Sequence, residues 1–240
     1  VVAEMAPARN LIIADGHHRY ETALTYRDEM RQRHPAAPSE AAFDYRMATF
    51  VGMDDPGLVI LPTYREVFGL PGLYPDEILS HAEAAFRVSP ATDLESCLAT
   101  LRAHAQDHAI GFYAQGQCHV LVLRDSAQLD RWIPETRSLA WKRLDVTLAH
   151  RIFLEQIVGL SAEAAETQAN LRYHRDPGPA IENVDAGQAN FVLLLNPTRI
   201  EQVRACAEQG ERMPQKSTDF YPKLVSGLTM MAVSPEERVG

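Results

Sequence analysis

Short apolar runs alternate with helix-spaced segments along the whole chain. Apolar runs of four to nine residues bounded by turn residues predict strands over 11–14, 45–53, 58–61, 110–113, 119–123, 190–195 and 228–233. Apolar positions at helical spacing predict helices over 18–33, 75–86, 93–105, 145–158 and 198–209. The Gln115-Gly116 pair lies between two of the strands and predicts a hairpin. The pattern indicates a mixed α/β protein.

One Pro- and Gly-rich segment, 70–75, is the best candidate for a hinge. It divides the chain into a first region, 1–72, which holds a strand-loop-helix unit, and a second mixed α/β region, 73–240. We expect the loop near residue 216, in the second region, to fold back against the first region.

Composition narrows the possible partners. Acidic residues outnumber basic ones 32 to 23, which gives a formal net charge of −9 and disfavours a nucleic-acid partner. The longest apolar run, 191–195, is far shorter than the roughly 18 residues of a membrane span. The 3 cysteines form no CxxC pair, so we interpret them as small buried residues. We therefore expect a cytoplasmic protein that binds a small molecule and no membrane.

The most informative segment is Asp15-Gly-His-His-Arg19, between a predicted strand and a predicted helix. The first turn of a helix has unpaired N–H groups and the positive end of the macrodipole, yet His17, His18 and Arg19 lie there. Each such cation costs a few tenths to about 1 kcal/mol. A bound phosphate would reverse the sign, so the segment predicts an anion site with Arg19 on the phosphate oxygens. Asp15 would hold Mg²⁺ or orient an attacking hydroxyl.

Structural alternatives stay open for the same residues. Asp15 could only cap the helix, His18 could be a core histidine, and Arg19 could pair with a nearby acid. Metal binding by the two histidines is less favoured, because the side chains of adjacent residues diverge around a helix.

The run Ala14-Asp-Gly-His-His-Arg-Tyr-Glu-Thr-Ala23 closely resembles the signature of a bacterial family known as domain of unknown function 1015. The resemblance extends over nearly the whole chain, including segments 53–62, 144–151 and 213–223. Members of that family carry a lengthy segment before the first motif. Because this chain begins at Val1, without an initiating Met, the resemblance implies that it is the C-terminal part of a larger protein.

The Asp15–Arg19 core is also similar to the phosphate-binding motif of the ParB/sulfiredoxin superfamily, which implies the same strand-loop-helix fold within a larger mixed sheet. Within that superfamily the nearest-looking enzymes are kinases that phosphorylate free serine with ADP or ATP. The resemblance implies a nucleotide on Gly16, His18 and Arg19. Sulfiredoxin has Cys where this chain has His17, so sulfinic acid reduction is not implied. In the serine kinases a catalytic carboxylate precedes the motif, and Glu4 is the only acid in the ten residues before Leu11.

A second group of cations and hydroxyls lies in the polar segment 211–223. Gln215 and Pro214 break its similarity to a P-loop, which needs consecutive backbone N–H groups around a phosphate. An ordinary solvated loop is the alternative. Our hypothesis is that the segment folds back beside the first motif and contacts the nucleotide and the substrate. The nucleotide contacts would be Lys216, Ser217 and Thr218, and the substrate contacts would be Tyr221 and Lys223.

Together these features predict a nucleotide-binding, kinase-like phosphotransferase. It would move a phosphoryl group from ATP or ADP, with Mg²⁺ at Asp15, to a small hydroxyl metabolite such as free serine. The predicted catalytic residues are Asp15, His17, His18 and Arg19. The alternatives are a nucleotide-sensing or DNA-associated regulator without kinase activity, and an inactive scaffold.

Overall fold

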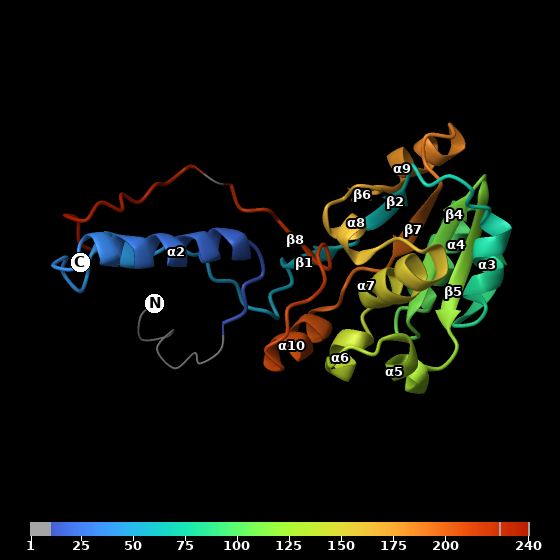
Figure 1. The fold of residues 1–240 in the computed structure, drawn as a ribbon, viewed down its shortest axis with the longest axis horizontal. Helices are drawn as coiled ribbons and strands as arrows, with labels where there is room; N and C mark the ends of the chain where they lie inside the picture. Colours follow the sequence, from blue (N-terminus) through green and yellow to red (C-terminus); the bar gives the residue numbers. More distant parts are fainter. Residues whose placement is uncertain (1–10, 226, 240) are drawn as a thin grey trace. The chain divides into compact units, whose positions relative to one another are not determined.

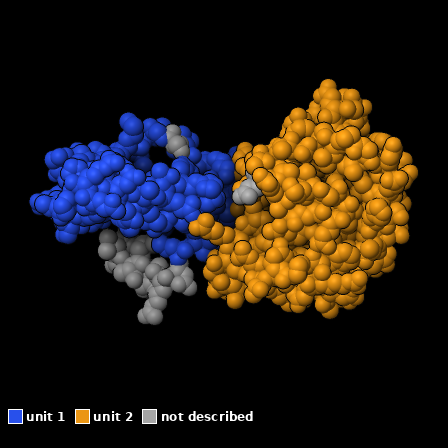
Figure 2. All heavy atoms as spheres, viewed as in Figure 1, with its two compact units in different colours: residues 1–59, 220–240 blue, residues 60–219 orange. Residues whose placement is uncertain are grey.

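The computed structural model describes residues 11–225 and 227–239, which fall into two compact units. Unit 1 comprises residues 1–59 and 220–240, and unit 2 comprises residues 60–219 (Figure 2). The sequence places its boundary near residue 72 and leaves the end of the chain in the second region. In the structure the end of the chain belongs to unit 1, where the Ala42 amide donates to the Glu237 carbonyl at 2.9 Å.

Unit 2 is built on a six-stranded sheet in which every paired strand is antiparallel (Figure 1). In sheet order the strands are β3 (Phe86–Ala91), β5 (Gln117–Leu123), β4 (Ala109–Ala114), β7 (Phe191–Leu195), β2 (Tyr64–Val67) and β6 (Leu171–His174). The predicted hairpin is confirmed by β4 and β5. Gln115 (φ 49°) and Gly116 (φ 77°) both have positive φ, as a tight hairpin turn requires.

Helices cover both faces of this sheet because its central strands are apolar on both sides. One core contains Phe112 and Phe191 with Phe153 of η3 (Leu148–Val158), a π-helix that continues α7 (Asp145–Thr147). The rings of Phe112 and Phe153 lie 5.7 Å apart. The other core contains Tyr113 and Leu194, with α4 (Leu94–Ala103) and α9 (Pro177–Asp185) against it. Both layers therefore depend on the same strands.

The remaining elements of unit 2 are short. Its other helices are α3 (Pro75–Ala82), η2 (Ser126–Gln128), α5 (Leu129–Trp132), α6 (Leu139–Lys142), α8 (Ala162–Glu166) and α10 (Ile200–Glu208). The strands β1 (Val59–Leu61) and β8 (Asp219–Tyr221) lie where the chain passes from one unit to the other. The mixed α/β class is confirmed.

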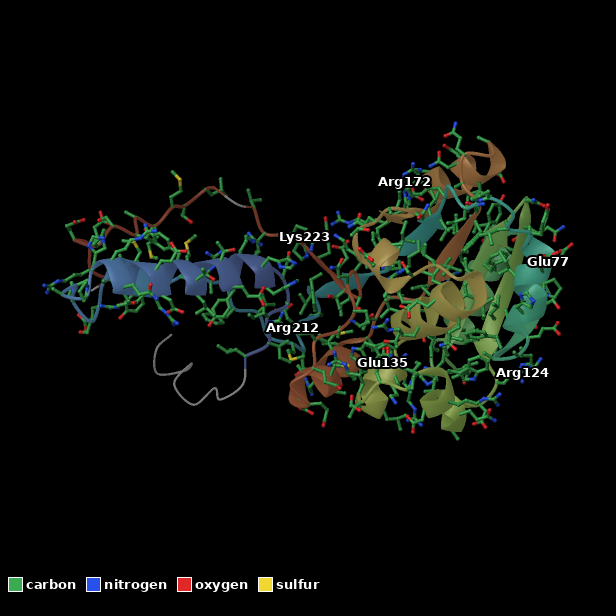
Figure 3. The ribbon with its side chains drawn as sticks, viewed as in Figure 1. Glu77, Arg124, Glu135, Arg172, Arg212 and Lys223 are labelled. Carbon is green, nitrogen blue, oxygen red and sulfur yellow. The ribbon has the colours of Figure 1, made fainter. Side chains whose placement is uncertain are left out.

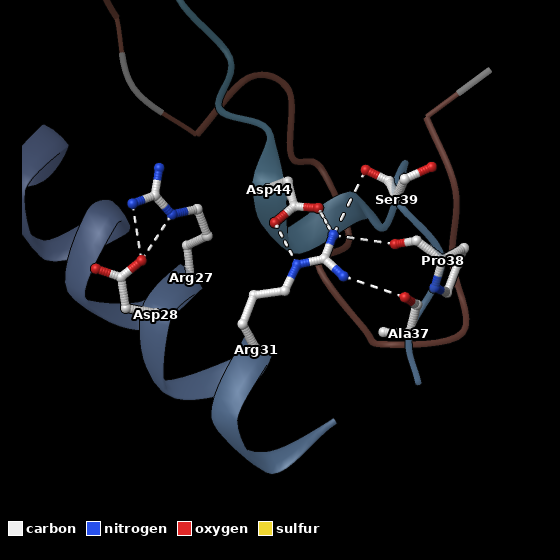
Figure 4. Close-up of polar contacts among 7 residues, drawn as sticks. All are labelled: Arg27, Asp28, Arg31, Ala37, Pro38, Ser39 and Asp44. Carbon is white, nitrogen blue, oxygen red and sulfur yellow. Dashed lines mark hydrogen bonds and ion pairs between the residues drawn. The ribbon is translucent and has the colours of Figure 1, made fainter. Parts of the chain in front are cut away.

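Unit 1 contains the long helix α2 (His17–Arg33) and the short helix η1 (Ala42–Asp44). Arg31 holds the C-terminal end of α2 in place (Figure 4). Its guanidinium donates to both carboxylate oxygens of Asp44, and to the carbonyls of Ala37 at 3.1 Å and Pro38 at 3.0 Å. Met30 is the one buried residue of the helix. The first turns of α2 are therefore left exposed.

Three predicted strands of unit 1 are wrong. Segments 11–14, 45–53 and 228–233 form no strand, and many of their apolar side chains are exposed, with Ile13 at 50%, Phe50 at 56% and Met230 at 91%. Apolar alternation indicates burial, but a strand also needs a partner for its backbone. The described residues of unit 1 supply no partner strand to these segments. The strand half of the predicted strand-loop-helix unit is thus absent, and the helix is confirmed.

Cys97, Cys118 and Cys206 are free and buried, which confirms their interpretation as core residues. Among the described residues, no helix combines the length and apolar character that crossing a membrane would require.

Gly111 of β4 tests the packing between the sheet and α4. A Cβ at this position would lie 2.9 Å from Leu194 Cβ and 3.4 Å from Cys97 Sγ. We expect Gly111→Ala to lower the free energy of unfolding by about 1–3 kcal/mol through overpacking, measured by urea denaturation. Gly178→Ala is the control, because its new methyl group would make only ordinary contacts. Equal stability of the two variants would contradict the close packing of β4.

Candidate functional site

The first turn of α2 has open backbone donors. The helix begins after Gly16, whose φ of 82° and ψ of 25° lie in the left-handed region that glycine favours. The first helical hydrogen bond joins the Tyr20 amide to the Gly16 carbonyl at 2.9 Å. No side chain caps the turn, no acid lies in it, and the amides of His17, His18 and Arg19 have no acceptor among the described residues. The sequence-based interpretation of Asp15 as a helix cap is therefore wrong.

Arg19 lies directly over the turn. A Cβ on Gly16 would lie 3.0 Å from Arg19 Nη2 and 3.1 Å from Arg19 Nε, so the absence of a side chain at Gly16 lets the guanidinium approach the backbone. Arg19 is exposed, and no carboxylate of the described chain forms an ion pair with it. The charge of Arg19 acts on the neighbouring Asp15, whose pKa it helps to lower.

The two histidines lie together at the helix start. Their ring centroids are 4.0 Å apart with planes tilted by 43°. His18 Nδ1 lies 3.8 Å from Glu21 Oε2, and the His18 side chain is 81% exposed. His18 is therefore not a core histidine. Both rings are exposed, and that they bind an anion at the helix start stays a prediction.

Asp15 connects this turn to the C-terminal segment of unit 1, through Lys223. Its Oδ1 accepts from the Gly16 amide at 2.7 Å, and Lys223 Nζ donates to its Oδ2 at 3.2 Å. Lys223 is labelled in Figure 3. Partial burial raises the pKa of Asp15, but the hydrogen bond and charge of Lys223, the Gly16 amide and the charge of Arg19 together lower it below its usual value. Asp15 is therefore a carboxylate at neutral pH.

The structure leaves the predicted Mg²⁺ site untested. Each oxygen of Asp15 accepts a hydrogen bond, one of them from a cation. Across the described residues, no group of three or more His, Cys, Asp or Glu side chains could hold a metal ion. Proteins usually hold Mg²⁺ with one or two carboxylates together with substrate phosphates, so that Asp15 binds Mg²⁺ stays a prediction.

The other predicted loop residues lie in unit 2 and are held by backbone contacts. The Lys216 carbonyl accepts from Arg65 Nη2 at 2.9 Å, and the Ser217 carbonyl accepts from Thr198 Oγ1 at 2.6 Å. Ser217 Oγ donates to the Pro214 carbonyl at 2.5 Å. That Lys216, Ser217 and Thr218 bind the nucleotide beside Asp15 stays a prediction.

Of the two predicted substrate residues, Lys223 contacts Asp15 and Tyr221 is 51% exposed. Glu4 lies outside the described residues. Arg65, a fully buried cation in β2, has no signal in the sequence, because the polar and apolar residues of that short strand show no periodic pattern.

The model of one protein family matches residues 1–147; its description is "protein of unknown function (DUF1015)". The chain belongs to this family. A search of the curated proteins found no match.

Solved structures similar to this chain include a conserved hypothetical protein from Pyrococcus furiosus. That protein is 14% identical with a TM-score of 0.43, and the match covers 87% of this chain and 68% of the other. A free serine kinase in complex with AMP is 13% identical with a TM-score of 0.40, and the match covers 72% and 57%. A mutant free serine kinase in complex with ADP is 10% identical with a TM-score of 0.39, and the match covers 72% and 58%. The chain thus spans little more than half the length of the free serine kinases.

Lys223→Met tests the contact between Asp15 and Lys223, which joins the two chain segments of unit 1. Because Lys223 stabilises the ionised form of Asp15, its removal should raise the pKa of Asp15. The lowered pKa means that this contact stabilises the fold above the pKa of Asp15 in the unfolded chain, and that the contribution disappears as the pH falls through the pKa in the folded protein. The pKa is measured from the Asp15 carboxyl ¹³C shift. Lys223→Arg should keep it low, and an unchanged pKa in Lys223→Met would contradict the contact.

Proposed function

We propose that this protein binds an adenine nucleotide by its phosphates at the start of α2, and transfers a phosphoryl group from ATP or ADP to a small hydroxyl metabolite such as free serine. The observation that carries the proposal is the uncapped first turn of α2, which has open amides and Arg19 over them, with no acid in the turn. A helix start of this kind binds phosphate through its N–H groups and its dipole.

Each group has a role that follows from its charge. The amides of the first turn and the Arg19 guanidinium bind phosphate oxygens, and Arg19 can do so with two parallel hydrogen bonds. His17 and His18 extend the donor surface along the exposed side of the turn. Since phosphoryl transfer depends mainly on positioning and charge neutralisation, these groups supply most of what the reaction needs.

Asp15 is the group suited to the acceptor. The hydroxyl oxygen of serine forms a bond to the terminal phosphorus, the bond from that phosphorus to the bridging oxygen breaks, and the nucleotide leaves with one phosphate fewer. The hydroxyl proton passes to the Asp15 carboxylate, which its low pKa keeps ionised at neutral pH. Lys223, 3.2 Å from Asp15, helps to hold the carboxylate in place.

Nucleotide binding is the first test. We expect ADP and AMP, the nucleotides in the similar free serine kinase structures, to bind with an affinity that isothermal titration calorimetry measures. Arg19→Ala should weaken ADP binding about tenfold or more, as expected for the loss of a charged hydrogen bond. Arg33→Ala is the matched control, since it removes the same charge from the last turn of the same helix. Equal losses of ADP affinity in Arg19→Ala and Arg33→Ala would contradict a phosphate site at the start of α2.

Turnover separates the kinase from its alternatives. Protein, ATP or ADP, Mg²⁺ and serine are incubated together, and phosphoserine is detected by ³¹P NMR. Phosphoserine that forms with the wild type and is lost with Arg19→Ala supports the proposal. Bound nucleotide without phosphoserine would indicate a nucleotide sensor, and no binding would indicate a scaffold.

A further inference from the structure

A cavity of about 290 Å³ in unit 2 has a cationic wall. Three arginines line it, Arg137, Arg151 and Arg212, and the last is labelled in Figure 3. Glu155 is the one acid among the described lining residues, and it accepts from Arg151 Nη1 at 2.7 Å. Arg151 also pairs with Glu135, outside the lining, with 3.1 Å between Arg151 Nε and Glu135 Oε1. The lining thus has three guanidinium groups against one carboxylate, in a chain whose formal net charge is −9.

A further arginine is buried behind the lining. Arg65 of β2 is 1% exposed and, in the described part of the chain, has no carboxylate partner. Its guanidinium donates to the carbonyls of Thr63 and Lys216 and, at 3.4 Å, to His150 Nε2. Burial lowers the pKa of Arg65 to about 10, so the group stays charged at neutral pH. A buried charge with only neutral partners adds to the positive potential of its surroundings.

Two neutral donors complete the wall. Burial first, and then the charges of Arg65 and Arg151, lower the pKa of His150 to about 3, so this ring is neutral at physiological pH. Because His150 Nε2 accepts from Arg65, its proton lies on Nδ1, which is a donor. Tyr173 also lines the cavity, and its buried hydroxyl has no hydrogen-bond partner within the described chain.

The cavity also has an apolar side. Trp141, Met213 and Pro214 line it together with the arginines. The Trp141 indole donates to the Arg212 carbonyl at 3.0 Å, and this bond holds the segment after α10 against α6. A ligand here would therefore meet cations at one end and apolar side chains along its body.

We propose that this cavity binds a small organic phosphate, with the phosphate on the arginines and the organic part against Trp141 and Met213. Guanidinium groups bind phosphate oxygens in pairs, and four of them, counting Arg65, face or lie behind this cavity. The lining residues all belong to unit 2, and the inference does not rest on the proposed function.

Phenyl phosphate is the probe for this site. The chain has 2 tryptophans, so Trp132→Phe leaves Trp141 as the only indole reporter. We expect phenyl phosphate to change Trp141 emission in a saturable manner, and phenol to leave it unchanged. Arg212→Gln and Arg137→Gln should each weaken binding about tenfold or more. Glu155→Gln should tighten binding, because it removes the one acid among the described lining residues.

Two controls separate this site from others. Arg87→Gln removes the same charge from an exposed position in β3 and should leave affinity unchanged. Arg19→Ala should also leave affinity unchanged, which separates this site from the start of α2. Circular dichroism checks that each variant folds. If Arg212→Gln does not fold, the affinity of Arg137→Gln decides the test.

The proposal is overturned by any one of three outcomes in folded protein. The first is that phenyl phosphate causes no saturable change in Trp141 emission. The second is that Arg137→Gln and the wild type bind phenyl phosphate with equal affinity. The third is that the wild type binds phenyl phosphate and benzoate with equal affinity.

Discussion

Positive charge with few carboxylate partners is the constraint on which both proposed sites depend. In unit 1 it lies at the start of α2, where Arg19 covers open amides and Asp15 is the nearby carboxylate. In unit 2 it lies in strand β2, where the buried Arg65 has two carbonyls and a neutral histidine as partners. Such arrangements cost stability in the free protein, and a bound anion would remove that cost. The proposal of anion binding therefore gives both placements one physical cause.

The fold supports these charges in different ways. Unit 2 has apolar cores on both faces of its sheet, so it can tolerate a buried guanidinium in β2. Unit 1 has a small core around Met30 and Phe43, and Arg31 holds its helix at the C-terminal end only. The opposite end of α2 is left exposed to ligand.

The sequence was informative where local chemistry decides the structure. The Gln115-Gly116 turn predicted the β4–β5 hairpin, and helical spacing predicted α2 and the long helix from Asp145 to Val158. The strand predictions for 11–14 and 228–233 were wrong, because a strand also needs a partner strand and the local sequence does not show whether one is present. The sequence also predicted the cationic helix start, because charge and turn residues are local. The hypothesis that segment 211–223 folds back beside the first motif placed Lys223 near Asp15, but the sequence could not specify the contact between these two side chains. Arg65 could not be predicted, since its partners lie in segments that are far apart in the chain.

The start of α2 as a phosphate site is tested most directly by ¹H–¹⁵N NMR of the protein during titration with ADP. The largest shifts are expected at the amides of His17, His18 and Arg19, because a phosphate would accept hydrogen bonds from these N–H groups. If ADP shifts the signals of other amides and leaves these three unchanged, the result would contradict a phosphate site at the start of α2.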